Sequence, residues 1–110
     1  MEDARLKSRL RVQAMLRQAA TQGVFGAVLR QGDADAGSLV LVLRGRQGLR
    51  LFSEAQDRDG QPGWLGGAGG TWVDQAAADA YQARRVDADP DCWVVEFEAE
   101  SLPFEARIFG

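Results

Sequence analysis

Residues 39–43 form the longest unbroken apolar run in the chain. Such a run predicts a strand that is buried on both faces and lies centrally in a sheet, although a buried helix segment can show the same pattern. The flanking glycines and the valine content favour the strand. A second apolar segment, residues 24–30, precedes it, and residues 31–37 between the two are rich in glycine and aspartate. These turn-forming residues predict a β-hairpin with an acidic tip.

Alternating apolar and polar residues predict further strands. Leu49 and Leu51 alternate with Arg50 after a short glycine-containing turn, so residues 49–52 continue the hairpin as an antiparallel meander of three strands. Residues 92–98 form a last strand whose larger side chains share one face: Trp93, Val95 and Phe97. The tail over residues 102–109 alternates weakly and predicts either an edge strand or aromatic side chains docked on the body.

Helical spacing appears twice. Apolar residues at i, i+3, i+4 and i+7 predict a helix over residues 9–22, with Ser8 as its N-cap and Gly23 as the glycine that follows its end. A short edge strand over residues 5–9 is an open alternative for the start of this segment. Asp74 is a good N-cap for a second helix that runs to about Val86 and carries a stripe made mainly of alanine.

These elements predict one α+β domain over residues 1–110. Their order is helix, three-stranded antiparallel meander, helix and final strand, with both helices packed on one face of the sheet. Residues 60–70 are rich in glycine, and convergent N–H groups in such a loop can bind an anion. The spacing of these glycines is not that of a phosphate-binding loop. We expect a flexible loop that Trp64 and Trp72 clamp to the body.

Composition excludes several classes of function. The chain has no histidine, so catalytic triads and dyads that need this base are excluded. The single cysteine, Cys92, excludes an internal disulfide and indicates a cytoplasmic protein. Its place in a half-buried strand argues against a reactive thiol. We expect neither a secretory signal nor a membrane span, since no apolar run is long enough.

Charge is unevenly distributed along the chain. Residues 1–50 contain nine Lys and Arg against four Asp and Glu, a net charge of +5, whereas residues 51–110 contain four against twelve, a net charge of −8. This asymmetry indicates either a basic surface for an acidic partner or two halves that attract each other in the fold. The basic N-terminal segment, which nucleic acid or another polyanion would contact, comprises Arg5, Lys7, Arg9 and Arg11. The alternative is that these side chains lie along the rim of an amphipathic helix.

Asp33 and Asp35 are a candidate metal site. Asp33 and Asp35 lie two residues apart in a glycine-bounded loop, where their oxygens suit a hard cation. The spacing is not that of an EF-hand, and Asp side chains in loops commonly accept bonds from nearby backbone N–H groups instead. A second acidic cluster comprises Asp87, Asp89 and Asp91, and we interpret it as the end of the second helix and the lead into the last strand. A carboxylate site would need the two clusters to meet in space. We predict no cofactor.

Three segments of the chain resemble a family of alphaproteobacterial domains of unknown function, numbered 1491. They are residues 6–19, residues 28–37 with Arg-Gln-Gly-Asp-Ala-Asp-Ala-Gly, and residues 81–96 with Asp-Pro-Asp-Cys-Trp-Val-Val-Glu. The resemblance spans about residues 4–100. It implies a compact cytoplasmic bacterial protein and supplies no activity, substrate or catalytic residue.

The sequence therefore favours a non-catalytic protein-interaction module, with a homodimer as one form of it. Edge strands would supply contacts, together with a predicted set of partner-binding residues: Trp64, Trp72, Asp91 and Trp93. One alternative is a divalent-metal site at Asp33 and Asp35 that acts on a phosphate ester or nucleotide. The other is nucleic-acid association through the basic segment.

Overall fold

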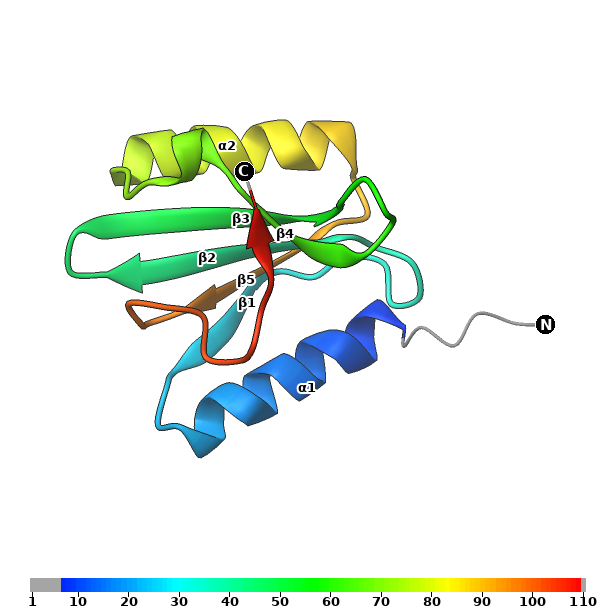
Figure 1. The fold of residues 1–110 in the computed structure, drawn as a ribbon, viewed down its shortest axis with the longest axis horizontal. Helices are drawn as coiled ribbons and strands as arrows, with labels where there is room; N and C mark the ends of the chain where they lie inside the picture. The colour runs from blue at the N-terminus through cyan, green and yellow to red at the C-terminus, as the bar shows by residue number, and fades with distance from the viewer. Residues whose placement is uncertain (1–6, 110) are drawn as a thin grey trace.

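The computed structural model describes residues 7–109 as an α+β fold built on one six-stranded sheet (Figure 1). The elements are α1 (Ser8–Thr21), β1 (Gly26–Arg30), β2 (Leu39–Gly45), β3 (Gly48–Gln56), β4 (Pro62–Gly66), the 3-10 turn η1 (Ala68–Gly70), α2 (Gln75–Ala88), β5 (Trp93–Phe97) and β6 (Ile108–Phe109). Within residues 7–109 no helix is long and apolar enough to cross a membrane.

The sheet is mixed, which corrects the predicted three-stranded antiparallel meander. The strand order is β1-β5-β2-β3-β4-β6. Only β2, β3 and β4 form a meander of antiparallel neighbours, while β5 pairs parallel with β2 and β6 pairs parallel with β4. The predicted hairpin of residues 24–44 is wrong, because β1 pairs antiparallel with β5 and never touches β2 as a neighbour in the sheet.

The physical reason is that β5 is as apolar as β2. Residues 92–95 are buried, as are residues 39–43. A strand that is apolar on both faces is stable only inside the sheet, so β5 takes the place beside β2 and β1 moves to the edge. Residues 31–38 therefore act as a crossover connection rather than as a tight turn.

The two edges of the sheet differ in length. At one edge β6 has two residues, and at the other β1 has five.

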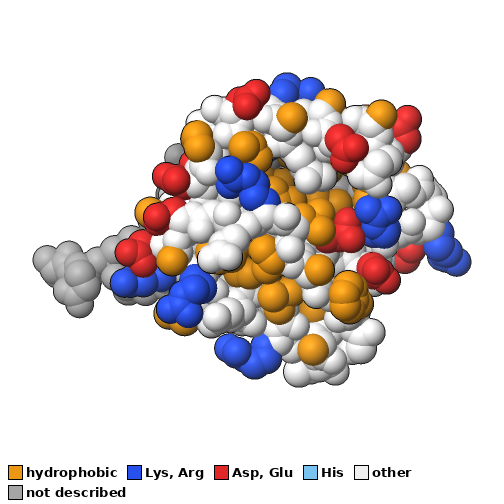
Figure 2. Space-filling view, turned by 180° about the vertical axis from the view of Figure 1, so that it is seen from behind, with side chains coloured by type: hydrophobic (Ala, Val, Ile, Leu, Met, Phe, Trp, Pro, Cys, Tyr) orange, Lys and Arg blue, Asp and Glu red, His pale blue; other side chains and the backbone are white. Residues whose placement is uncertain are grey.

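In Figure 1, β4 and β6 lie toward the viewer. The opposite side of the molecule, shown in Figure 2, carries hydrophobic side chains in the middle of its surface with charged side chains around them.

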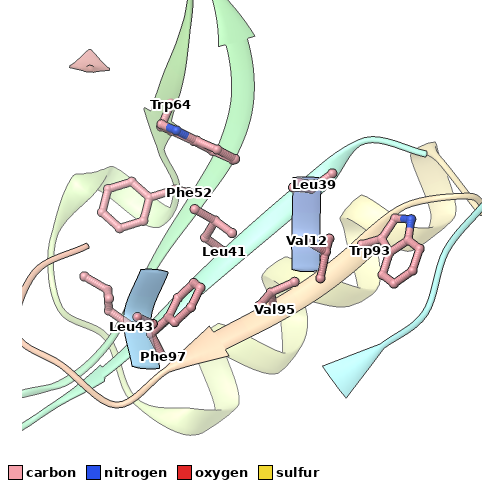
Figure 3. Packing of buried hydrophobic residues seen from close by; sticks show 10 residues of the cluster. Val12, Leu39, Leu41, Leu43, Phe52, Trp64, Trp93, Val95 and Phe97 are labelled. Carbon is pink, nitrogen blue, oxygen red and sulfur yellow. The ribbon is translucent and has the colours of Figure 1, made fainter. Parts of the chain in front are cut away.

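The helices cover opposite faces of the sheet, so the prediction that both pack on one face is wrong. Val12 and Ala19 of α1 pack with one face of the sheet, where the buried side chains are Leu39, Leu41, Leu43, Phe52, Trp64, Trp93, Val95 and Phe97 (Figure 3). Ala78 of α2 packs with the other face, on Val40, Val42, Leu49, Leu51, Cys92 and Val94. A strand buried on both faces requires this arrangement, since each face needs its own cover.

The predicted helix ends are confirmed at Gly23 and Asp74. Gly23 has φ +72° just after α1, and the Asp74 carboxylate accepts a hydrogen bond from the Ala77 N–H (2.9 Å). Ser8 is not the N-cap. It is the first residue of α1 and is buried, and its hydroxyl donates to the Gly37 carbonyl (2.5 Å). A strand over residues 5–9 is excluded for residues 8 and 9, which are helical; residues 5 and 6 lie outside the described range.

The glycine-rich segment is more ordered than predicted. It contains β4, which pairs with the second half of β3, and Trp64 on β4 lies in the core. The tail does form an edge strand, β6, and Phe104 docks edge-on against Phe97 with ring centroids 5.8 Å apart. Both alternatives for the tail are thus realised.

Candidate functional site

The carboxylate of Asp33 is engaged within its own loop. It accepts hydrogen bonds from the N–H groups of Asp35 (3.0 Å) and Ala36 (2.8 Å). Asp35 is exposed and pairs with Lys7 at 3.5 Å. The loop therefore has the local geometry expected of a turn-forming aspartate.

The two acidic clusters do meet in space, through backbone rather than through paired carboxylates. The Asp33 N–H donates to the Asp91 carbonyl (2.9 Å), and the Ser38 hydroxyl donates to the Asp89 carboxylate (2.5 Å). The other oxygen of that carboxylate accepts the Asp91 N–H (3.0 Å). The Ser38 and Asp91 hydrogen bonds hold the pKa of Asp89 below its usual value.

We call this contact of residues 32–38 with residues 89–93 the crossover junction. A Cβ atom on Gly37 would lie 2.0 Å from the Asp91 carbonyl oxygen, and one on Gly32 would lie 2.1 Å from it. The indole N–H of Trp93 donates to the Asp33 carbonyl (2.7 Å). Across residues 7–109 no group of three or more Cys, Asp or Glu lies close enough to hold a metal ion. Close packing of the two backbone segments therefore accounts for the glycines of the crossover junction.

The basic N-terminal segment is used partly inside the fold. Arg11 is half-buried and donates to one carboxylate oxygen of Glu54 (2.6 Å), whose other oxygen accepts the Leu39 N–H (2.7 Å). Lys7 and Arg9 are exposed, and Arg5 lies outside the described residues. Further ion pairs join the two halves of the chain, Arg44 with Glu96 and Arg46 with Glu100. Part of the opposite charge on the two halves of the chain therefore forms ion pairs between them within the fold.

The predicted partner-binding tryptophans are mostly interior. Trp64 is 7% exposed and Trp93 is 4% exposed, so both belong to the core, which corrects the prediction of a surface Trp64. Trp72 is half-buried, with the Arg50 guanidinium 5.8 Å from its ring centre. Asp91 is exposed. Of the four, Asp91 and the outer part of Trp72 remain accessible to a partner.

A shallow pocket of about 200 Å³ lies between α1, the outer strands and the tail. Its lining residues are Arg11, Glu54, Pro62, Gly63, Trp64, Glu105, Ala106 and Arg107. Its two arginines are already paired, Arg11 with Glu54 and Arg107 with Asp57 (2.7 Å). The two guanidinium groups that line this pocket therefore already have ion-pair partners.

The most distinctive exposed feature is the edge of the sheet at β1. Phe25 just before the strand is 62% exposed, Leu29 is 49% exposed and Val28 is 40% exposed. We call these three side chains, with the open backbone edge of Gly26–Arg30, the β1 edge. The register with β5 shifts between Val28 and Arg30, and Leu29 is the residue added there. Bulges of this kind commonly re-aim a side chain.

The sequence does not predict the β1 edge, because it predicts that residues 24–30 form one arm of a hairpin. In a hairpin their apolar side chains would be covered by the neighbouring strand. One feature of the sequence does indicate this edge. Residues 27–29 are apolar at consecutive positions, and successive side chains of a strand point to opposite faces, so both faces of this strand carry an apolar side chain that needs a neighbour to bury it.

A family model described as "Protein of unknown function (DUF1491)" matches residues 6–103. The chain belongs to the DUF1491 family. This confirms the resemblance, whose most distinctive segments form the two sides of the crossover junction. The family's description names no activity. No curated protein matches the chain.

Solved structures agree with the fold. The crystal structure of a DUF1491 family protein from Caulobacter crescentus CB15 is 34% identical, with a TM-score of 0.83 over 96% of this chain and 100% of that chain. An NMR structure of a DUF1491 family protein from the same organism is 33% identical, with a TM-score of 0.80 over 96% and 97%. Protein Atu0922 from A. tumefaciens is 26% identical, with a TM-score of 0.76 over 88% of each chain.

Proposed function

We propose that this DUF1491 protein is a non-catalytic cytoplasmic interaction module that binds a second copy of itself through the β1 edge. The observation that carries the proposal is the exposure of Phe25, Val28 and Leu29 along an open strand edge. An uncovered strand edge presents unpaired backbone N–H and C=O groups to any extended chain, and apolar side chains beside it add contact area.

Natural proteins commonly protect such an edge, and protection here is slight. Residues 26–30 contain no proline, their one charged residue, Arg30, stands at the end of the strand, and the bulge at Leu29 leaves the Leu29 side chain exposed. The opposite edge is blunted by the short β6. The buried Cys92 suits the cytoplasm, where thiols stay reduced.

Charge complementarity favours a second copy as the occupant. Arg30 ends β1, and exposed Glu98 lies beside its start, where the Glu98 N–H donates to the Phe25 carbonyl (2.9 Å). Antiparallel pairing of two copies brings the start of each strand beside the end of the other. Each Arg30 then lies near Glu98 of the second copy, and the interface is self-complementary as a two-fold axis requires.

Sedimentation equilibrium of matched variants tests the proposal. Leu29→Ser removes an apolar side chain from the β1 edge, and Leu65→Ser removes one of similar exposure (45%) from β4. Burying the exposed half of Leu29 contributes about 1 kcal/mol per copy, or about 2 kcal/mol per symmetric dimer. We expect Leu29→Ser to raise the dimer Kd by about 30-fold, and Leu65→Ser to leave it unchanged.

Two outcomes would overturn the dimer. One is a wild-type protein that stays monomeric up to about 1 mM, where association is worth only about 4 kcal/mol. The other is an equal effect of Leu29→Ser and Leu65→Ser, which would place the interface elsewhere.

A further inference from the structure

Trp64 on β4 carries a polar group that the fold leaves without a partner. The side chain is 7% exposed, and its indole N–H meets no hydrogen-bond acceptor among residues 7–109, whereas the indole N–H of the similarly buried Trp93 donates to the Asp33 carbonyl. Buried indole N–H groups usually find a partner. Within the same residues only Arg85 Nε is both unpaired and sealed from solvent, so the Trp64 N–H opens onto accessible space. Because Trp64 lines the shallow pocket between α1, the outer strands and the tail, that space is the pocket.

Short contacts between β4 and the tail hold the walls of this pocket in place. The main-chain N–H of Trp64 donates to the Arg107 carbonyl (2.8 Å). A Cβ atom on Gly63 would lie 2.8 Å from the same carbonyl oxygen, so the missing side chain at Gly63 lets the tail come this close. The pocket is therefore formed before any ligand arrives, which lowers the entropic cost of binding.

Two guanidinium groups bring further hydrogen-bond donors to the pocket. Arg11 of α1 uses Nη2 to bind Glu54 (2.6 Å), and Arg107 of the tail uses Nη2 to pair with Asp57 (2.7 Å). A guanidinium carries several N–H donors in addition to the one that each of these pairs uses. The indole N–H of Trp64 and the two guanidinium groups thus supply donors from three elements to one cavity of about 200 Å³.

The charges that line the pocket balance one another. Both oxygens of Glu54 are occupied, by Arg11 and by the Leu39 N–H. Glu105, which also lines the pocket, is exposed and takes part in none of the ion pairs found among residues 7–109. Two arginines and two glutamates give the lining no net formal charge. A dianion would leave this balance negative, whereas a ligand with one charge of each sign preserves it.

We propose that this pocket binds a free α-amino acid. The carboxylate of the ligand accepts hydrogen bonds from the Trp64 N–H and from the arginine donors, since a guanidinium matches the geometry of a carboxylate. The ammonium group of the ligand pairs with Glu105, and an aliphatic side chain lies against Pro62 and Ala106. Pockets for drug-sized ligands measure about 300–1,000 Å³, so a pocket of about 200 Å³ suits a ligand as small as an amino acid.

The site is independent of the proposed dimer contact. The strand order β1-β5-β2-β3-β4-β6 places β4 and β6 at the opposite end of the sheet from β1. A second copy that pairs with β1 therefore leaves the pocket open. We expect the affinity for the amino acid to be the same at protein concentrations that favour the monomer and the dimer.

Nitrogen-15 NMR of the indole N–H groups tests the proposal directly. The titrant is L-leucine. L-leucinamide, which lacks the carboxylate, and N-acetyl-L-leucine, which lacks the ammonium group, are the controls. We expect L-leucine to shift the Trp64 indole signal saturably with a Kd on the order of 1 mM, and each analogue to bind at least about tenfold more weakly because it loses a charge-assisted hydrogen bond. The Trp93 indole signal should stay in place, since that N–H is bonded to Asp33. No saturable shift of the Trp64 signal, or binding of either analogue as tight as that of L-leucine, would overturn the site.

Matched variants test the role of Glu105. Glu105→Gln removes the charge from an exposed side chain, and Asp87→Asn makes the same change from carboxylate to amide on an exposed residue of α2 outside the pocket. We expect Glu105→Gln to weaken L-leucine binding at least about tenfold and to leave the weak binding of N-acetyl-L-leucine unchanged, because that analogue has no ammonium group to lose. Asp87→Asn should bind L-leucine as the wild type does. Equal affinity for L-leucine in the two variants would overturn the proposal.

Discussion

Gly37→Ala is the substitution that probes the crossover junction most sharply. The added Cβ would lie 2.0 Å from the Asp91 carbonyl oxygen, and contacts under 3.0 Å are essentially never seen for real Cβ atoms. The atom that the added Cβ would meet belongs to the backbone. Two main-chain hydrogen bonds hold that backbone in place: the Asp33 N–H donates to the Asp91 carbonyl (2.9 Å), and the Trp93 N–H donates to the Ser38 carbonyl (2.8 Å). No flexible side chain can move aside to relieve the overlap.

The size of the effect follows from what must move. A shift of about 1 Å between the two segments breaks the Asp33–Asp91 bond and the bond from the Ser8 hydroxyl to the Gly37 carbonyl. Each hydrogen bond contributes about 1 kcal/mol, and the strain of overpacking adds about 1 to 3 kcal/mol. We expect a loss of about 3 kcal/mol or more in the free energy of unfolding. For a domain near this size the melting temperature would fall by about 12 °C or more.

Urea unfolding followed by tryptophan fluorescence measures this loss, and Gly23→Ala serves as its control. Gly23 has φ +72° and no atom within 4 Å of an added Cβ, so alanine there costs only the left-handed backbone, about 1 kcal/mol. A Gly37→Ala variant that loses no more stability than Gly23→Ala would refute the close packing of residues 32–38 on residues 89–93.

Three further predictions concern the same region. Trp93→Phe removes the donor to the Asp33 carbonyl and should lower the free energy of unfolding by about 1 to 2 kcal/mol; an unchanged urea midpoint would contradict the hydrogen bond. The hydrogen bond from Ser38 lowers the pKa of Asp89 in the folded protein. The stability that the Asp89 carboxylate contributes is therefore fully present above its pKa in the unfolded chain, about 3.9, and is lost as the pH falls through its lower pKa in the folded protein. Asp89→Asn should therefore lose less stability than wild type between about pH 5 and pH 2 in acid melts. Cys92 is 1% exposed with a raised thiol pKa, so a thiol reagent should label it only after unfolding; rapid labelling of the native protein would show that β5 is not interior.

Local features of the fold could be predicted from the sequence because short-range chemistry determines them. The left-handed glycine at Gly23, the cap at Asp74 and the shared face of the side chains on β5 all follow from neighbours within a few residues. The doubly buried run at residues 39–43 also predicted its own central place.

Strand pairing could not be predicted in the same way. Two strands, β2 and β5, have the apolar pattern of a central strand, and nothing local states that they pair in parallel across about fifty residues. The short segment at residues 31–37 has the composition of a hairpin turn, yet the Asp33 N–H donates to the Asp91 carbonyl and the Asp33 carbonyl accepts from the Trp93 indole N–H. Such a partner is visible only once the chain is folded.

Errors in the candidate site have two sources, the glycine-rich composition around β4 and the misassigned partner of β1. The tryptophan of β4 was placed at the surface because its strand lies within a glycine-rich segment, and the exposed side chains of β1 were assumed to be covered. Exposure depends on which strands are neighbours, so the β1 edge emerges only from the sheet order.

Hydrogen exchange of the peptide spanning residues 24–30, measured by mass spectrometry at a series of protein concentrations, tests the central claim most directly. If β1 pairs with β1 of a second copy, its outward amides gain hydrogen bonds and their exchange slows as concentration rises, whereas exchange in β4 does not change. Exchange in residues 24–30 that is fast and independent of concentration, in a protein that nevertheless dimerises, would contradict the β1 edge as the interface.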